Sequence, residues 1–277
     1  MIDILLATYN GQKYLNQQID SILAQTCKDF RLLIRDDSSC DNTINIIKNY
    51  ISKFPDRIRL IIDNKGHLGL AQNFAALLES SQGKYIMFCD QDDVWLPTKI
   101  ELTINTMKEA EQTYPGLPLL VHTDLRVVDE NLNIIADSLW HLIGIDPRTA
   151  SNLDKLIIRN SVTGCTMMIN SKARDISLPI PPQAPIHDWW IAMNVAKLGK
   201  IIQITAPTIL YRQHSGNVIS AGKKNPYRIS DYKARIINQY NVVKKVVPEI
   251  NPVILIARIL VSEIARKVKT KNSRISG

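Results

Sequence analysis

Residues 85–95 read YIMFCDQDDVW, a mostly apolar run that passes directly into three carboxylates, Asp90, Asp92 and Asp93. The residues before the first carboxylate have the length and side-chain bulk of a strand buried on both faces. Carboxylates placed this close together repel one another unless a cation or a proton offsets their charge. The stretch therefore predicts a buried strand whose acidic end holds a ligand.

Three units of strand and helix precede this stretch. Apolar strands are expected at residues 3–7, 30–37 and 58–62, and a helix with one apolar face follows each of them, as another does at residues 96–111. Such alternation predicts right-handed crossovers and a mostly parallel sheet, whose ligands usually bind beyond the carboxyl ends of the strands. The polar residues that follow the four strands therefore meet at one edge. They are Thr8, Tyr9 and Asn10, then Asp36, Asp37 and Ser38, then Asn64, Gly66 and Gly69, and finally Asp90, Asp92 and Asp93.

The regular alternation ends near residue 115. We therefore expect an α/β fold with a mostly parallel central sheet flanked by helices, in which residues 1–115 and 116–222 are two halves and residues 223–277 are a helical extension. The later elements expected are two strands joined by a turn near Asn131, a strand at 160–170, a helix at 186–198, strands at 201–204 and 208–211, and a basic amphipathic helical tail.

The composition is that of a soluble globular protein, with 45% apolar and 22% charged residues. The first residues lack a basic segment followed by a long apolar one, so no signal peptide is expected. The sequence also lacks the uncharged run of about 18 residues that a membrane-spanning helix needs. The four cysteines form no CxxC pair, which suits reduced thiols. We expect a cytoplasmic protein.

The net charge of +8 comes from the C-terminal tail, since residues 221–277 hold 13 Lys and Arg against 3 Asp and Glu. No aromatic stacking surface or nucleic-acid-binding motif accompanies these charges, so nucleic acid is not expected as a partner. A peripheral helix on the anionic inner face of the cell membrane and a packed, solvated extension both fit the apolar residues between the charges. Those apolar residues are Ile236, Val243, Val247, Ile254, Ile256 and Leu260.

The acidic end of residues 85–95 predicts Mg2+ or Mn2+ as cofactor, because carboxylates are the ligands these ions prefer and such ions usually neutralise a phosphate-bearing substrate. Two alternatives remain open. In one, Asp93 caps the following helix and the other acids are solvated. In the other, the stretch is the apolar-DxDx(V/T) motif of a haloacid dehalogenase type phosphatase with Asp90 as nucleophile. The three units of strand and helix that precede the stretch count against the phosphatase, because the motif of those enzymes normally follows the first strand.

Several motifs follow the order found in one enzyme family. They are ILLATYNGQKYLNQQIDSILAQT, LLIRDDSSCDNT, NKGHLGLAQNF, YIMFCDQDDVWLPTKIE, HDWW and LYRQHSGN. Across residues 2–222 the chain resembles inverting glycosyltransferases of family 2, which have the GT-A fold. FCDQDDVWLPTKI, TGCTMMIN and HDWWIA most resemble the bacterial rhamnosyltransferase branch. The resemblance makes residues 1–115 the nucleotide-binding half and residues 116–222 the acceptor-binding half.

The resemblance also implies a role for each matching residue. Asp188 of HDWW matches the catalytic base. Asp90 and Asp92 match the DxD pair that holds the ribose and the metal, and Asp93 is a further candidate. His214 can meet the metal or the diphosphate. The other residues expected to contact the donor are Thr8, Tyr9, Asn10, Asp36, Asp37, Asn64, Gly69 and Arg212, with Asp37 or Asp36 on the base.

The chain departs from the commoner family pattern at three places. DDSS stands at residues 36–39 where many members have DDGS, HDWW stands at residues 187–190 where many have an ED or GD pair, and Phe74 follows Asn73 where many have Asn-Arg. The missing arginine removes one contact to the diphosphate. His67 and Arg212 are the candidates to compensate for it.

Together the resemblance and the residue types predict a metal-dependent inverting glycosyltransferase. Asp188 would take the proton of an acceptor hydroxyl as it attacks the anomeric carbon, and a single displacement inverts the configuration. The resemblance favours dTDP-rhamnose as donor, with UDP-hexoses next, and a lipid-linked oligosaccharide or a cell-surface polysaccharide as acceptor. A catalytically inactive sugar-nucleotide-binding module is the non-enzyme alternative, and a homodimer is left open.

Overall fold

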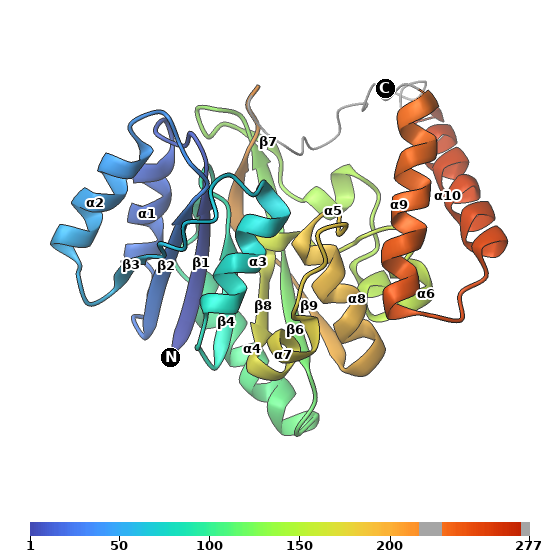
Figure 1. Cartoon of the computed structure of the whole chain (residues 1–277), viewed down its shortest axis with the longest axis horizontal. Coiled ribbons are helices and arrows are strands. Elements are labelled where there is room, and N and C mark those ends of the chain that lie inside the picture. The colour runs from blue at the N-terminus through green and yellow to red at the C-terminus, as the bar shows by residue number, and fades with distance from the viewer. Residues whose placement is uncertain (216–228, 273–277) are drawn as a thin grey trace.

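Figure 1 shows a central sheet with helices on both of its faces. The computed structural model describes residues 1–215 and 229–272, with side chains described up to residue 215 and from 234 to 262. The strand order is β3-β2-β1-β4-β8-β6-β9-β5, and β7 pairs with β6. The α/β fold expected from the sequence is confirmed. The boundary expected between residues 222 and 223 lies outside the described residues.

The first half of the chain builds four parallel strands. They are β1 (Ile2–Thr8), β2 (Phe30–Asp36), β3 (Ile58–Leu60) and β4 (Tyr85–Cys89). β1 lies between β2 and β4, with Ile4 in register with Leu32 on one side and Met87 on the other. All four lie where the sequence predicts them, although β3 stops at Leu60, before the expected end at Ile62.

Helices α1 (Leu15–Leu23), α2 (Thr43–Lys53), α3 (Leu70–Ser80) and α4 (Lys99–Thr113) follow these strands. Side chains alternate along β1: Ile4 and Leu6 pack in one core with α1, α2 and α4, whereas Leu5 and Ala7 pack in the other core with α3. Because both faces of the sheet are covered, polar side chains that face a ligand gather beyond the strand ends.

The second half adds strands of both directions. β8 (Met167–Asn170) lies between β4 and β6 (Leu119–Val128) and runs antiparallel to both. β9 (Lys200–Arg212) runs parallel to β6, and β7 (Ile134–Ala136) pairs with the far end of β6. The turn near Asn131 therefore joins two strands, as the sequence predicts.

A short strand that the sequence analysis missed follows the acidic stretch. Val94–Trp95 form β5, which pairs antiparallel with β9. The helix expected from residue 96 therefore begins only at Lys99. Asp93 precedes a strand and not a helix, so the expectation that Asp93 caps a helix is wrong.

Two further boundaries differ from the expectation. A single strand, β9, replaces those expected at 201–204 and 208–211, because its pairing with β6 continues through shifts of register near Asp124. Of the strand expected at 160–170, only β8 forms. The short 3-10 turn η2 (Gly164–Thr166) precedes β8.

The remaining short elements of this half surround α8 (His187–Leu198), which confirms the helix expected at 186–198. Trp189 and Trp190 anchor α8 in the core, since their indole N–H groups donate to the carbonyls of Leu156 and Ser177 at 2.7 Å. The other elements are α5 (Leu139–Leu142), η1 (Pro147–Ser151), α6 (Leu153–Leu156) and α7 (Ser171–Ser177).

The C-terminal segment forms α9 (Ile229–Val246) and α10 (Pro252–Asn272), at the right of Figure 1. Val243 of α9 and Leu255 of α10 are buried in the same core as α8. Other apolar residues of α10 face outward, and Ile254 is 58% exposed. Within residues 1–215 and 229–272, no helix has both the length and the apolar character needed to cross a membrane.

Candidate active site

The loops after β1 and β2 are bound to each other at the carboxyl edge of the sheet. Thr8 Oγ1 donates to Asp36 Oδ1 at 2.9 Å, and the Asn10 N–H donates to Ser39 Oγ at 2.8 Å. Asn10 takes a positive φ of 48° and accepts from the Cys40 N–H through Oδ1 at 2.9 Å. Thr8, Asn10 and Asp36, which are predicted to contact the sugar-nucleotide donor, therefore lie together, as the strand order requires.

Asp37 is neutralised by the chain itself. Its side chain is 2% exposed and forms an ion pair with the equally buried Arg35 at 2.9 Å. Its two carboxylate oxygens also accept the N–H groups of Leu68 and Gly69, at 2.7 and 2.8 Å. Gly69 takes a φ of 76°, which favours glycine. Asp37 thus fixes the loop after β3, and its predicted contact with a base remains a prediction.

Arg35 connects this loop to the rest of the sheet edge. Its guanidinium donates to Asp63 at 2.9 and 3.1 Å and to Asn73 Oδ1 at 3.0 Å. Asn64, one of the residues predicted to contact the donor, is exposed beside this pair with a φ of 56°. The sequence analysis missed Arg35, because an arginine inside an apolar strand gives no sign of which acids it meets.

Gln91, the middle residue of the DQD triplet, joins the acidic stretch to the loop after β1. Its Oε1 accepts from the Tyr9 N–H and its Nε2 donates to the Tyr9 carbonyl, both at 2.9 Å. A Cβ atom on Gly11 would lie 2.2 Å from Gln91 Oε1, so this close approach requires glycine. Gln91 was also missed, because only the fold shows that it faces Tyr9.

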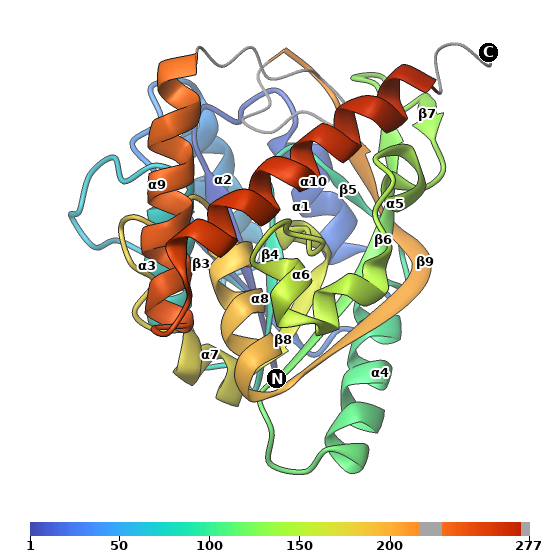
Figure 2. The ribbon, with the colours of Figure 1, turned by 90° about the vertical axis from the view of Figure 1, so that its right-hand side faces the viewer.

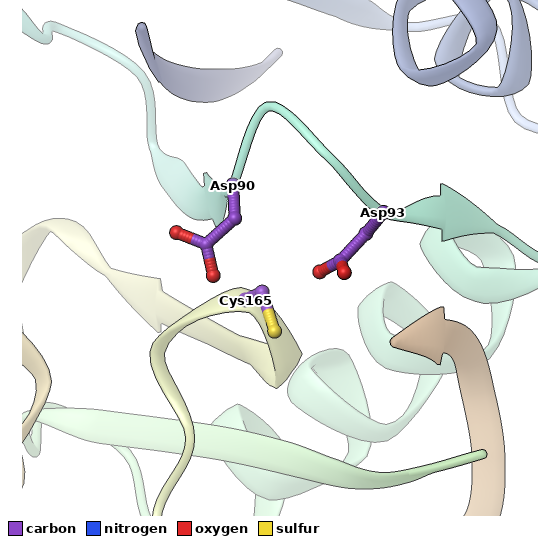
Figure 3. A group of neighbouring side chains, drawn as sticks. All are labelled: Asp90, Asp93 and Cys165. Carbon is purple, nitrogen blue, oxygen red and sulfur yellow. The ribbon is translucent and has the colours of Figure 1, made fainter. Parts of the chain in front are cut away.

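The acidic end of β4 meets a thiol from η2, as Figure 3 shows. Possible ligand atoms of Asp90, Asp93 and Cys165 all lie within 4.8 Å of one another. Asp93 is fully buried; its Oδ1 accepts from the Arg212 N–H at 3.1 Å, and its Oδ2 has no hydrogen-bond partner in the described structure. Cys165 belongs to the TGC motif, yet its place beside the acids is visible only once β8 pairs with β4.

Burial and mutual repulsion perturb these acids. Burial, then the charge of Asp92 and then that of Asp188, raise the pKa of Asp90 to about 7. Burial and the charges of Asp92 and Asp90 raise the pKa of Asp93 well above its usual range. The buried Lys99, whose own pKa burial lowers to about 8, contributes a positive charge near Asp93. The sequence analysis missed Lys99.

Asp92 faces the end of β9. Its Oδ2 lies 2.9 Å from His214 Nε2, and its backbone carbonyl accepts from Arg212 Nε at 2.8 Å. The Arg212 guanidinium lies over the Tyr14 ring, 4.4 Å from its centroid. The structure therefore brings His214, Arg212 and Asp92 to the same edge. Of the three predicted metal ligands, only Asp90 belongs to the group with Asp93 and Cys165, whereas Asp92 and His214 lie outside that group and contact each other.

These residues fit a divalent cation. Buried carboxylates with raised pKa values, and an Asp93 oxygen without a partner, mark a place where positive charge is in short supply. Carboxylate oxygens are the ligands that Mg2+ and Mn2+ prefer. Which of Asp90, Asp92 and Asp93 would contact such an ion directly stays a prediction.

Asp188 lies in the first turn of α8 and is 5% exposed. Its Oδ1 accepts from Asn160 Nδ2 at 2.9 Å and its Oδ2 from the Gly164 N–H at 2.8 Å. Burial raises the pKa of Asp188 to about 7, although these hydrogen bonds oppose the rise. A Cβ on Gly164 would lie 3.2 Å from Asp188 Oδ2 and 2.8 Å from His187 Nε2, so glycine permits this approach.

Two departures from the family pattern are in contact with each other. The rings of Phe74 and His187 lie 4.0 Å apart between centroids, and Phe88 stacks on His187 at 5.1 Å. His187 is fully buried, and burial lowers its pKa to about 3, so the imidazole is neutral. Two neutral aromatic side chains therefore occupy the positions where many members carry an arginine and a glutamate or glycine. His67, one candidate to replace that arginine, lies 4.8 Å from the Tyr9 ring.

Comparison with known proteins identifies the class of enzyme. Residues 3–175 match the family model described as Glycosyl transferase family 2. Since this match covers more than half of the chain, the chain belongs to that family and is a glycosyltransferase. Its membership decides against the phosphatase alternative, in which Asp90 was the nucleophile.

Individual relatives agree with this assignment. The chain is 29% identical over 224 residues to an uncharacterized glycosyltransferase of Nostoc, covering 78% of this chain and 66% of that protein. It is 28% identical over 230 residues to the dTDP-rhamnosyl transferase RfbG of Shigella flexneri, covering 78% of this chain and 74% of that protein. The chain thus spans about two thirds to three quarters of the length of these curated relatives.

Solved structures share the fold. S. aureus TarS 1–349 in complex with UDP-GlcNAc aligns with a TM-score of 0.64 at 15% identity, covering 93% of this chain and 70% of that chain. The mannosyltransferase PcManGT of Pyrobaculum calidifontis, in complex with GDP-Man and Mn2+, aligns with a TM-score of 0.59 at 17% identity, covering 93% and 68%. At these identities the likeness shows a GT-A-like fold.

Proposed function

We propose that the chain is a metal-dependent inverting glycosyltransferase that moves a sugar from a nucleotide diphosphate to a hydroxyl of a cell-surface polysaccharide or lipid-linked oligosaccharide precursor. The observation that carries the proposal is the placement of Asp188. It is a buried carboxylate whose Oδ2 accepts from the N–H of Gly164 at 2.8 Å, and the next residue after that glycine, Cys165, lies in one group with Asp90 and Asp93. A single turn of chain, η2, therefore contacts both the proton acceptor and the acidic strand end.

Asp188 has the properties of a general base. Its pKa of about 7 lets it be ionised near neutral pH and still bind the proton of the attacking hydroxyl. Asn160 and Gly164 each hold one of its oxygens, which fixes the direction of the carboxylate. With a single base and no carboxylate nucleophile in the proposal, displacement occurs in one step and inverts the anomeric carbon.

The other residues hold the donor. Asp90, Asp92 and Asp93 would hold Mg2+ or Mn2+, which when bound supplies the positive charge that a departing diphosphate needs. Thr8, Tyr9 and Asn10 line the edge where the nucleotide would lie. Tyr9 is 47% exposed and is therefore accessible to a ligand.

We propose dTDP-rhamnose as the first donor to test. The dTDP-rhamnosyl transferase of Shigella flexneri, at 28% identity, supports this choice. UDP-GlcNAc and GDP-Man, the ligands of the similar structures, are the next candidates. The basic α9 and α10 support a peripheral position at the inner face of the membrane, where a lipid-linked acceptor is found.

A panel of dTDP-rhamnose, UDP-glucose, UDP-GlcNAc and GDP-mannose, with Mg2+, Mn2+ or EDTA, tests the proposal by release of the nucleoside diphosphate. We expect metal-dependent turnover of one donor, lost in Asp92→Ala and Asp188→Ala and kept in Asp175→Ala, an exposed carboxylate on α7. Turnover that survives EDTA and both site substitutions would contradict the mechanism. Donor binding without any turnover would favour the inactive module.

A further inference from the structure

A cavity of about 580 Å³ lies between α10 and residues 144–161. Figure 2 shows α10 running obliquely across the molecule above α6, which belongs to that segment. The apolar walls of the cavity include Ile145, Ile158 and Val261. No residue assigned above to the donor or to the proton transfer lines it.

The apolar wall continues onto the outer surface of α10. Val261, which lines the cavity, is 66% exposed, and Ile254, two helical turns earlier, is 58% exposed. The opposite side of the helix is buried, with Leu255 at 1% and Ile259 at 3% exposure. An apolar chain that leaves the cavity would therefore find a further apolar surface along α10.

Cationic and polar groups accompany this apolar wall. Lys155, Arg159 and Arg258 line the cavity together with two acids, Asp146 and Asp154. The acids already have cationic partners, since Asp146 lies 2.9 Å from Arg148 and Asp154 lies 3.6 Å from Arg258. The lining therefore carries three cations against two acids, and Arg258 is shared with Asp154.

Ser161 adds a second, independent observation. Its side chain is 4% exposed, its Oγ has no hydrogen-bond partner in the described structure, and it lines the cavity. A buried hydroxyl without a partner is costly unless a ligand or water satisfies it. A ligand with polar oxygens is therefore indicated at this side of the cavity.

The cavity wall and the proposed base share one segment of chain. Arg159 and Ser161 line the cavity, and Asn160 between them donates to Asp188 Oδ1 at 2.9 Å. Arg159 is itself fixed, because its Nη2 donates to the Ile143 carbonyl at 2.9 Å. A molecule held by this wall therefore lies next to the residue that orients the base.

We infer that this cavity binds the acceptor, and that the acceptor is a lipid-linked saccharide with a phosphate beside its apolar chain. The phosphate lies among Lys155, Arg159 and Arg258, the apolar chain follows Ile158 and Val261 along α10, and the saccharide points toward Asp188. This inference rests on the proposed function and adds the site and chemical class of the acceptor.

Farnesyl diphosphate, a soluble probe with an apolar chain and a diphosphate, tests the inference by titration calorimetry on the full chain. The titration is made in a saturating concentration of the nucleoside diphosphate of the donor that the panel identifies, so that the probe cannot report binding at the donor site. We expect binding that inorganic diphosphate or farnesol alone does not reproduce. Val261→Glu should weaken it at least tenfold, because it places a carboxylate in the apolar wall.

Val253→Glu is the matched control, since Val253 lies on the same helix, is 73% exposed and does not line the cavity. It should bind the probe as the wild type does, and circular dichroism checks that both variants fold. Equal weakening by both variants, or binding only to phosphatidylglycerol vesicles, would overturn the inference in favour of a general membrane surface.

Donor turnover in the wild type separates this inference from the proposed function. If the wild type turns over a sugar nucleotide but does not bind the probe, the acceptor site is wrong and the proposed function stands. If no sugar nucleotide is turned over, the proposed function fails by itself.

Discussion

Strands β2 and β4 flank β1, and both end in neighbouring carboxylates, yet the chain treats the two ends differently. At the end of β2, Asp37 pairs with the buried Arg35 and accepts two backbone N–H groups. At the end of β4, burial and repulsion raise the pKa values of Asp90 and Asp93. Asp188 accepts two hydrogen bonds, yet burial raises its pKa to about 7 as well.

We propose that this difference separates acids that stabilise the fold from acids that serve a ligand. A buried carboxylate that the chain neutralises stabilises the fold and has little capacity left for a substrate. A buried carboxylate that the chain leaves without compensation costs free energy, and a cation or a proton from a substrate removes that cost. Two adjacent aspartates in the sequence give the same signal in both cases, so only their surroundings tell them apart.

The largest expected effect is on Asp188. Asp188→Asn keeps the size of the side chain but removes the base, so turnover should fall about 10³-fold. Initial rates at saturating donor measure it, with Asp175→Asn as the matched exposed control. A loss below about tenfold would mean that Asp188 belongs with the structural acids.

The second largest effect is expected at Asp37, the buried carboxylate that Arg35 neutralises. Asp37→Ala leaves the buried Arg35 without one of its carboxylates and frees two backbone N–H groups. The free energy of unfolding should fall by about 3 kcal/mol. Urea denaturation measures this loss, and Asp56→Ala, an exposed acid of the same half, should change it by less than about 0.5 kcal/mol. Similar values for the two variants would contradict a structural role for Asp37.

A smaller effect on the rate of turnover is expected when the pH is lowered. The pKa of Asp188 is raised to about 7, and a base must be ionised to act. The rate should therefore fall about tenfold for each pH unit below 7 and level off above it. Rates between pH 5 and 9 at saturating metal and donor test this, with donor affinity followed at each pH as a control. A rate that stays level down to pH 5 would rule out a base with this pKa.

The smallest effect has the opposite sign to that at Asp37. Asp90→Asn removes a carboxylate whose pKa is raised in the folded protein, so in EDTA at pH 8 it should stabilise the fold by about 1 kcal/mol. Stability that depends on protonated Asp90 is present below pH 4 and is lost as the pH rises through 7. The gain should therefore shrink at pH 5, as urea denaturation at both values would show. A loss of stability in EDTA would place Asp90 with Asp37.

The sequence predicts the parts of the molecule that local pattern specifies. Apolar runs predict the positions of β1, β2 and β4, and the spacing of apolar residues predicts those of α3 and α8. Both signals can be read from the sequence because periodicity depends only on neighbouring residues. The pairing of strands that lie far apart in the sequence cannot be predicted from such local patterns. The strand Val94–Trp95 exists only because β9 lies beside it, and β9 remains one strand through the shift at Asp124.

The same limit applies to the candidate site. Residues that follow strands, such as Asp90 and Asp92, could be predicted because parallel strands bring their ends together. Cys165, Lys99 and Arg35 could not, since their proximity to the acids depends on β8, α4 and the loop after β3. Gln91 stands within the motif itself, but its two hydrogen bonds to Tyr9 depend on the packing of two loops.

The contact between Phe74 and His187 couples the effects of substituting these two residues. A single Phe74→Arg substitution would place a guanidinium against a neutral, buried imidazole. A single His187→Glu substitution would add a carboxylate next to Asp188 without a cation to meet it. Because the two rings touch, the effects of substituting both residues are not expected to add, and the double substitution should cost less stability than the sum of the two single ones.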